Sequence, residues 1–459
     1  MVNMEQRWGL PLIAWPDRLR PNLWDLVALP MVLGAIFLLA WGGMAMGTRY
    51  HIGETLTISL DPWHLPQYAL RTVLRMAAAL VASLGFSLVY AAMAAKSRAA
   101  EKIMIPLLDI LQSVPILGFL SITVTGFIAL FPGRLLGVEC AAIFAIFTSQ
   151  AWNMTFSLYQ SLRTVPIELA EAARMYHLSA WQRFWRLEVP HAIPQLVWNM
   201  MMSVSGGWFF VVASEAITVS GQTILLPGIG SYIATAIAER DLGAIGYAVL
   251  VMLVVILLYD QLLFRPLLAW AAKFRGDPGG DEDIVRPWFL LVLQRAQLFD
   301  LFHSGALALN RAADAGLALL TRRRGVRREL PPGPAWVERL YDLALLALSA
   351  AALVWIVAFI RETVPGGEIG RVALLGGITA IRVVVLIALA SLIWVPIGVW
   401  IGLRPRLADR VQPIVQFLAA FPANLFFPVA VVLILRFRLN AEIWLSPLMI
   451  LGTQWYILF

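Results

Sequence analysis

The chain has 459 residues, of which 60% are hydrophobic and only 14% are charged. A soluble domain of this size cannot bury so much apolar surface, because about half of the residues are apolar in a typical globular protein. Several apolar runs reach the roughly 20 residues that cross a bilayer. The composition therefore excludes an ordinary soluble protein and predicts an all-α polytopic membrane protein. The single Cys140 excludes an intrachain disulfide, and the five scattered histidines form no HExxH pair or Cys/His cluster, which predicts no metal site.

The N-terminal segment, residues 1–67, combines a polar start with the first apolar run. Its first 23 residues contain arginines and three prolines, and they lack the apolar core of a cleavable signal peptide. We therefore expect the first span to serve as the targeting signal and to be followed by an outer loop.

Further apolar runs predict about ten membrane spans in total. They fall roughly at 24–46, 70–95, 108–131, 140–160, 195–219, 244–264, 340–360, 374–402, 411–435 and 443–459. Basic residues gather in alternate loops, so the positive-inside rule places the N-terminus in the cytoplasm. The net charge of +7 reflects this topology and gives no argument for a nucleic-acid partner or an anionic substrate.

After the first span, the remaining spans form two groups, residues 68–272 and 340–459, separated by the polar segment 273–339. This segment opens with GDPGGDED and closes with TRRRGVRRELPPGP, so we expect a cytoplasmic linker. Its middle predicts either an amphipathic helix on the inner membrane face, with arginines toward the lipid headgroups, or a solvated tether. The sequence leaves both interpretations open.

The two groups of spans resemble each other when residues 72–121 are laid over 379–428 without gaps. The matched pairs include Arg75 and Arg382, Pro106 and Pro413, and Pro115 and Pro422. In both copies the two prolines follow a basic turn at the same distance, which favours two tandem repeats. We expect the second copy to be incomplete, because it stops at Phe459 before a charged segment like that of the first copy.

Residues 163–194 form a charged, helix-forming island between two apolar runs. Pro166 suits the first turn of a helix, and strong helix formers follow until about His177. The next residues, SAWQ, have the spacing of a capping box. They predict a second short helix that ends at Pro190 and Pro194. Both ends of the island join membrane spans, which argues against a DNA-binding helix-turn-helix.

The island resembles the EAA loop of the permease subunits of ABC importers that use a substrate-binding protein. The family pattern is Glu-Ala-Ala, a Gly four residues after the second Ala, then an apolar residue and a Leu-Pro pair. The matching residues here are Glu171, Ala172, Ala173, His177, Leu187, Val189 and Pro190. His177 replaces the glycine, and because His tolerates the left-handed conformation better than most residues, we expect the turn to persist. The SVP sequence at 113–115 and the later GIGSYI resemble the nitrate, sulfonate and taurine branch.

This resemblance implies the type I ABC importer transmembrane fold, with the island docked on a separate ATPase. The implied ATPase-coupling loop comprises Glu168, Glu171, Ala172, Ala173, His177, Leu187 and Pro190. The implied partners are two copies of an ABC ATPase subunit, an extracytoplasmic substrate-binding protein and membrane lipid, with no nucleic acid. The chain has no Walker A pattern. We therefore expect it not to be an enzyme and to bind no cofactor, with ATP held by the partner subunit.

Three charged residues inside predicted spans are candidates for a translocation path or gate. Glu215 lies late in its span, and an ionisable group within the membrane is by default a functional candidate. Simple hydration near the outer interface is the equal alternative for Glu215. For Arg75 and Arg382, near the outer ends of their spans, snorkelling to the interface is the expected role and attraction of an anion is the alternative.

These patterns together predict a permease subunit in the bacterial inner membrane that passes a small solute, an anion such as nitrate, a sulfonate or taurine. One alternative is an ion-coupled secondary transporter built on repeats, which would need buried charges in both halves. Another is a non-transporting scaffold. An importer needs two docking loops and this chain has one. We therefore expect either a truncated copy of a longer fused permease or a pair of chains, and truncation is preferred because the last span lacks a basic inner flank.

Overall fold

The computed structural model describes residues 57–219, 222–274 and 335–420 without interruption, and shorter pieces near 30–48, 288–291 and 430–447. Most of the predicted linker and of the last predicted span lies outside the described residues. Parts of other predicted spans near both ends of the chain also lie outside them.

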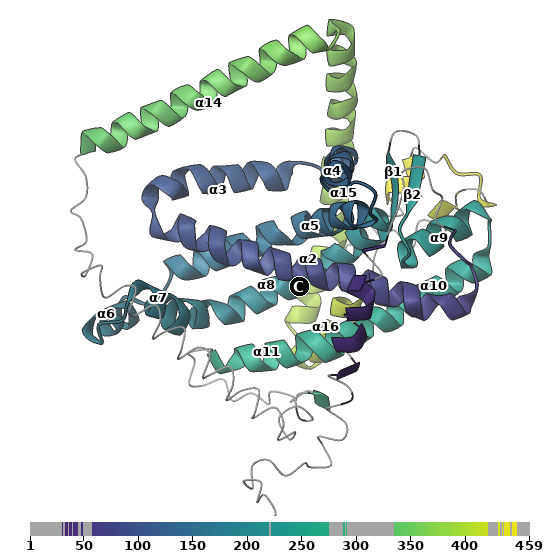
Figure 1. The fold of residues 1–459 in the computed structure, drawn as a ribbon, viewed down its shortest axis with the longest axis horizontal. Helices are drawn as coiled ribbons and strands as arrows, with labels where there is room; N and C mark the ends of the chain where they lie inside the picture. Colours follow the sequence, from purple (N-terminus) through teal and green to yellow (C-terminus); the bar gives the residue numbers. More distant parts are fainter. Residues whose placement is uncertain are drawn as a thin grey trace, which may run out of the picture.

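Helices make up nearly all of the described chain (Figure 1). In the first half they are α2 (Leu65–Lys96), α3 (Arg98–Ser113), α4 (Ile116–Leu130), α5 (Leu136–Arg163), α6 (Ile167–Met175), α7 (Ala180–Arg183), α8 (Val189–Glu215), α9 (Ile229–Ala238), α10 (Leu242–Tyr259) and α11 (Arg265–Ala271). The second half contributes α14 (Ala335–Thr363), α15 (Gly366–Gly402) and α16 (Pro405–Ala420).

Five helical segments among the described residues are long and apolar enough to cross a membrane. They are 62–96, 180–215, 242–274, 336–363 and 366–402, and each contains or overlaps a predicted span. The predicted span 140–160 lies within α5, whereas 108–131 is divided between α3 and α4. The division falls at Pro115, because a proline disfavours helical backbone in the residue before it, and Val114 is indeed extended (ψ 126°). The full set of about ten spans stays a prediction.

The core of the first half is formed by α2, α5 and α8, which lie side by side, with α9 and α10 packed against them (Figure 1). Small hydroxyl side chains allow α2 and α5 to approach closely, and the hydroxyls of Ser87 and Thr155 lie 2.9 Å apart. Larger side chains fill the remaining space: Trp208 on α8 is buried and meets Tyr259 edge to face at 5.4 Å. These contacts hold the two ends of the bundle in a fixed relation.

The second helix of the island does not end at Pro190 and Pro194, contrary to expectation. A π-helical turn (Phe184–Glu188) follows α7 and leads directly into α8, so that residues 180–215 form one helical segment. Pro190 falls in the first turn of α8, after the change of hydrogen-bonding pattern in the π turn, and Pro194 lies inside the helix. The shift in pattern lets the chain pass the first proline, whose missing N–H would otherwise interrupt an α-helix.

Helix α8 is followed by a two-stranded antiparallel hairpin and then by a short helix. Strands β1 (Ala216–Val219) and β2 (Gln222–Leu225) pair with Ala216 opposite Leu225. The amide of Leu226 then donates to the carbonyl of Glu215 at 2.8 Å, which closes the hairpin against the end of α8. The short helix that follows is α9.

Among the described residues, the second half contacts the first half through α14 and through α16. Lys102 on α3 donates to Asp342 on α14 at 2.6 Å, and the hydroxyl of Tyr341 donates to the carbonyl of Ala99 at 2.9 Å. Helix α16 packs against α8 and α10. Most side chains of α14 and α15 are exposed in this chain, so these apolar helices offer their surfaces to lipid or to other protein.

Candidate functional site

Helix α6 carries the first part of the island, at one end of the bundle (Figure 1). It ends in a left-handed residue, His177, whose φ is 52°. The amide of Leu178 donates to the carbonyl of Ala173 at 3.1 Å, and the amide of His177 donates to the carbonyl of Arg174 at 2.9 Å. This pair of bonds is the Schellman motif, which satisfies carbonyls at a helix end. The predicted turn at His177 is therefore confirmed.

Helix α7 starts the second part of the island with the predicted capping box. The amide of Gln182 donates to the hydroxyl of Ser179 at 3.2 Å, and the amide of Ser179 donates to the side-chain oxygen of Gln182 at 3.0 Å. Trp181 and Trp185, four residues apart, meet edge to face at 5.5 Å. The island is thus a preformed pair of short helices with a fixed turn between them.

The surface of α6 is apolar as well as charged. Glu168 and Glu171 are exposed. Four large apolar side chains are exposed as well: Ile167 (72%), Leu169 (46%), Met175 (80%) and Tyr176 (80%). Several exposed large apolar side chains on one short, charged helix between two membrane helices make this helix a candidate interaction site. We call these four residues, with the two glutamates, the α6 face.

The two alanines of the EAA sequence are placed differently. Ala173 is buried, and α6 contacts the π-helical turn at 184–188, so its small side chain serves the packing of the island on its own chain. Ala172 is half-buried. Leu187 and Pro190 are also half-buried, in and after the π turn.

The base of the island is joined to α2 and α3 by charged residues that the sequence did not single out. Glu188 is buried and lies between two cations, 2.8 Å from Nε of Arg183 and 3.3 Å from Nζ of Lys96. The Lys96 ammonium also lies 4.5 Å from the ring centroid of Phe184. Lys96 ends α2. The island is therefore joined to α2 as well as to α8.

A buried ion cluster lies at the other end of the same helices. Arg75 on α2, Glu139 on α5 and Glu215 on α8 have fully buried side chains. Two nitrogens of Arg75 donate to the two oxygens of Glu139, at 2.5 and 2.8 Å. Its third nitrogen donates to Glu215 at 2.7 Å. Charged groups of this kind are tolerated in an apolar interior only when paired and hydrogen-bonded.

Glu215 also holds the backbone that follows the hairpin, residues 226–230, which we call the glycine loop. Its carboxylate accepts from the amide of Gly230 at 2.6 Å and from the hydroxyl of Thr72 at 2.7 Å. Thr72 in turn accepts from the amide of Ile229 at 3.0 Å, and Arg75 donates to the carbonyl of Pro227 at 3.0 Å. The glycine loop is therefore bonded to α2 and α8 through the ion cluster.

The predicted path or gate residues have different environments. Glu215 and Arg75, which the sequence treated separately, are brought together inside the protein, so Arg75 does not snorkel and Glu215 is not at a hydrated surface. Arg382, the repeat mate of Arg75, is exposed on α15 and makes no ion pair with another described residue. Glu139 was missed, and the only signal for it was an ionisable residue at the start of an apolar run.

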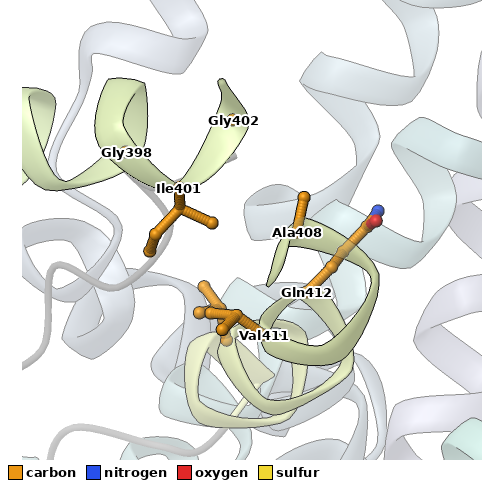
Figure 2. Close-up of a pocket in the computed structure, with 7 residues that line it drawn as sticks. Gly398, Ile401, Gly402, Ala408, Val411 and Gln412 are labelled. Carbon is orange, nitrogen blue, oxygen red and sulfur yellow. The ribbon is translucent and has the colours of Figure 1, made fainter. Parts of the chain in front are cut away.

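A cavity of about 220 Å³ lies between the end of α15 and α16 (Figure 2). Its lining is Gly398, Ile401, Gly402, Ala408, Val411, Gln412 and Val415. Gln412 is the one polar side chain among the described lining residues, and these residues offer little to orient a charged solute. Among the described residues, no group of three His, Cys, Asp or Glu side chains could hold a metal ion.

The structure thus defines a polytopic helical membrane protein with a preformed, partly apolar helix pair between two long helices. Residues 83–264, which include the island, match the family described as "Binding-protein-dependent transport system inner membrane component". This segment also includes Glu139 and Glu215 of the ion cluster. The part of the chain that carries the candidate sites therefore resembles the inner-membrane permeases of ABC importers.

Curated relatives agree with this match. The chain is 26% identical over 121 residues to the bicarbonate transport system permease protein CmpB of Synechocystis sp., covering 26% of this chain and 41% of the relative. It is 27% identical over 169 residues to the glycine betaine/carnitine transport permease protein GbuB of Listeria monocytogenes, covering 37% and 54%. It is 26% identical over 113 residues to the nitrate import permease protein NrtB of Leptolyngbya laminosa, covering 25% and 38%. The chain spans about half, or less, of the length of these relatives.

Proposed function

We propose that this chain is the membrane-spanning permease subunit of an ABC importer, and that the island docks a separate ATPase subunit. The observation that carries the proposal is the α6 face, an exposed apolar and acidic surface on a short helix that is braced by its own turn and base. Isolated helices of this length are marginal in water. A preformed, rigidly held helix with exposed apolar residues is suited to insertion into a groove on a partner.

The contacts of the island suggest how movement of the ATPase reaches the membrane. The π turn joins α7 to α8 without a break, so a displacement of the island passes directly into α8. The ion pair between Glu188 and Lys96 passes part of it to α2. In this proposal Glu168 and Glu171 contact the partner, His177 sets the turn, and Leu187 and Pro190 lie where the island enters α8.

ATP hydrolysis is assigned to the partner, because the sequence contains no Walker A pattern. The chain then binds no cofactor of its own, and two ATPase subunits serve the assembled importer. The island lies on the cytoplasmic side of the bacterial inner membrane in this arrangement, as the distribution of basic residues predicts. The hairpin and α9, at the opposite end of α8, face the extracytoplasmic substrate-binding protein.

Two features support a second permease repeat in residues 340–459, after a first core in 68–272. Helix α16 begins 307 residues after α3 (405 against 98). Arg382 follows Arg75 by the same interval (382 against 75). An equal offset of a helix and of a charged residue within a span is expected of duplication.

The substrate we propose is a small solute, with an anion such as nitrate or a sulfonate preferred. The relatives named for bicarbonate and nitrate favour an anion as the substrate. The relative named for glycine betaine and carnitine makes a small zwitterion the second candidate substrate. An ion-coupled secondary transporter would instead use the buried carboxylates of Glu139 and Glu215. The second half offers no such counterpart among the described residues, since Arg382 is exposed there.

Reconstitution tests the proposal directly. The full chain is placed in proteoliposomes with an ATPase subunit, ATP and a binding protein, each omitted in turn. We expect uptake of radiolabelled solute only when all are present. Uptake driven by an ion gradient without ATP would overturn the proposal in favour of a secondary transporter.

A further inference from the structure

We propose that Glu215 is a positioning residue that fastens the glycine loop to the helix bundle, and that the ion cluster forms no part of the solute path. The bonds of Glu215 lie within the chain. This inference rests on the proposed function only where it assigns this end of the bundle to the extracytoplasmic side.

The position of the cluster follows from the order of the helices. Glu139 stands in the first turn of α5, whose last residue is Arg163, where the island begins. The 24 residue steps from Glu139 to Arg163 (163 against 139) span about 36 Å of helix at 1.5 Å per residue. Glu215 likewise ends α8, which begins beside the island. Figure 1 shows α6 and α7 at one end and the hairpin with α9 at the other. The cluster therefore does not touch the island.

Most of the hydrogen-bonding capacity of the cluster is taken up by groups of the protein. Three nitrogens of Arg75 donate to Glu139, to Glu215 and to the carbonyl of Pro227. Both oxygens of Glu215 accept bonds, one from Arg75 and Thr72 and the other from Gly230. Because all three charged side chains are fully buried, a passing solute has no access to them in this structure. The groups are arranged to bind the loop.

Two glycines show that the loop is fitted to Glu215. A Cβ at Gly228 would collide with the carboxyl group of Glu215, and a Cβ at Gly230 would collide with the carbonyl of Val212. Only glycine lets the backbone approach the carboxylate and α8 this closely. The amide of Gly230 reaches Glu215 because of this approach. Carboxylate and loop are thus complementary in shape as well as in charge.

Glu139 provides a matched comparison for Glu215. Both are glutamates, both are fully buried, and both bond to Arg75. Only Glu215 also bonds to the glycine loop. Loss of charge at either position disturbs the cluster, but loss at Glu215 alone removes a charge-assisted bond to the loop backbone. Such bonds are stronger than neutral ones.

Hydrogen exchange of peptides covering 226–238 distinguishes the two roles, in the full-length protein in detergent or nanodiscs. We expect Glu215→Gln to accelerate exchange of the glycine-loop amides about tenfold relative to wild type, because a hydrogen bond to a charged group is lost. Glu139→Gln should leave these amides within about twofold of wild type, since their own acceptors remain. Thr72→Val removes the acceptor for Ile229 without a change of charge, and should accelerate exchange in the same peptide even if Glu215→Gln does not fold.

Equal acceleration in Glu215→Gln and Glu139→Gln would overturn the proposal, because the cluster would then be a general stabiliser only. Unchanged exchange in both Glu215→Gln and Thr72→Val would also overturn it. Solute uptake measured in parallel separates a solute contact from positioning: a higher KM in Glu215→Gln, with exchange unchanged, would place Glu215 on the solute path. The exchange result does not depend on ATP or on a binding protein, so it stands even if the transport proposal fails.

Discussion

Replacement of Arg75 by methionine should destabilise the first half of the protein strongly. The substitution keeps an unbranched side chain of similar length but leaves Glu139 and Glu215 buried without their cation. Removing one partner of a buried ion pair costs about 3–5 kcal/mol. For a domain of 150–250 residues, 1 kcal/mol corresponds to about 2–4 °C in Tm, so the expected decrease is about 6–20 °C.

The repeat provides the control for this prediction. Arg382 occupies the equivalent position in α15 but is exposed, with no ion pair to another described residue. Arg382→Met should therefore change the Tm by no more than about 2 °C, as is usual for exposed substitutions. Both variants are heated in detergent at one scan rate and the remaining folded protein is measured by fluorescence-detected size exclusion. Equal decreases in the two variants, or a decrease below about 2 °C for Arg75→Met, would refute the buried cluster.

Two further predictions concern the island. His177→Gly should preserve or improve ATPase-driven uptake, because glycine adopts a φ of 52° without strain. His177→Val should reduce uptake by about tenfold, because β-branched residues disfavour this conformation. Equal uptake by the two variants would contradict the role of His177 in the turn. Glu188→Gln removes the charge that joins the island to Lys96 and Arg183, so ATP hydrolysis in the complex should continue while uptake per ATP falls by about tenfold. A parallel loss of hydrolysis and uptake would show a docking defect instead of a transmission defect.

Local rules predicted the island well. The capping box and the left-handed turn at His177 depend only on residues within five positions of one another, so the sequence determines them. The prediction that Pro190 and Pro194 end the second helix was wrong, because the π turn that accommodates Pro190 has no comparable signal in the sequence. Local reasoning therefore succeeded where hydrogen bonds follow a standard pattern and failed where the pattern shifts.

The ion cluster could not be predicted, for a different reason. Arg75 lies 64 residues from Glu139 and 140 from Glu215 along the chain, and their meeting depends on how α2, α5 and α8 pack. Each of these charged residues, taken alone, indicated only a candidate functional position within an apolar run. The hairpin formed by β1 and β2 could not be predicted either. Its β-branched residues directly follow an apolar span, and the sequence pattern alone does not distinguish them from a continuation of that span.

The most direct test of the central claim is protection of the α6 face by the ATPase subunit. Met175→Cys and Trp63→Cys are introduced separately after Cys140→Ser, at two exposed positions at opposite ends of α2, α5 and α8. Maleimide labelling is measured with and without the ATPase subunit. The account predicts that the ATPase slows labelling at Met175→Cys by at least about tenfold and leaves Trp63→Cys unchanged. Unprotected Met175→Cys, or protection at Trp63→Cys instead, would contradict it.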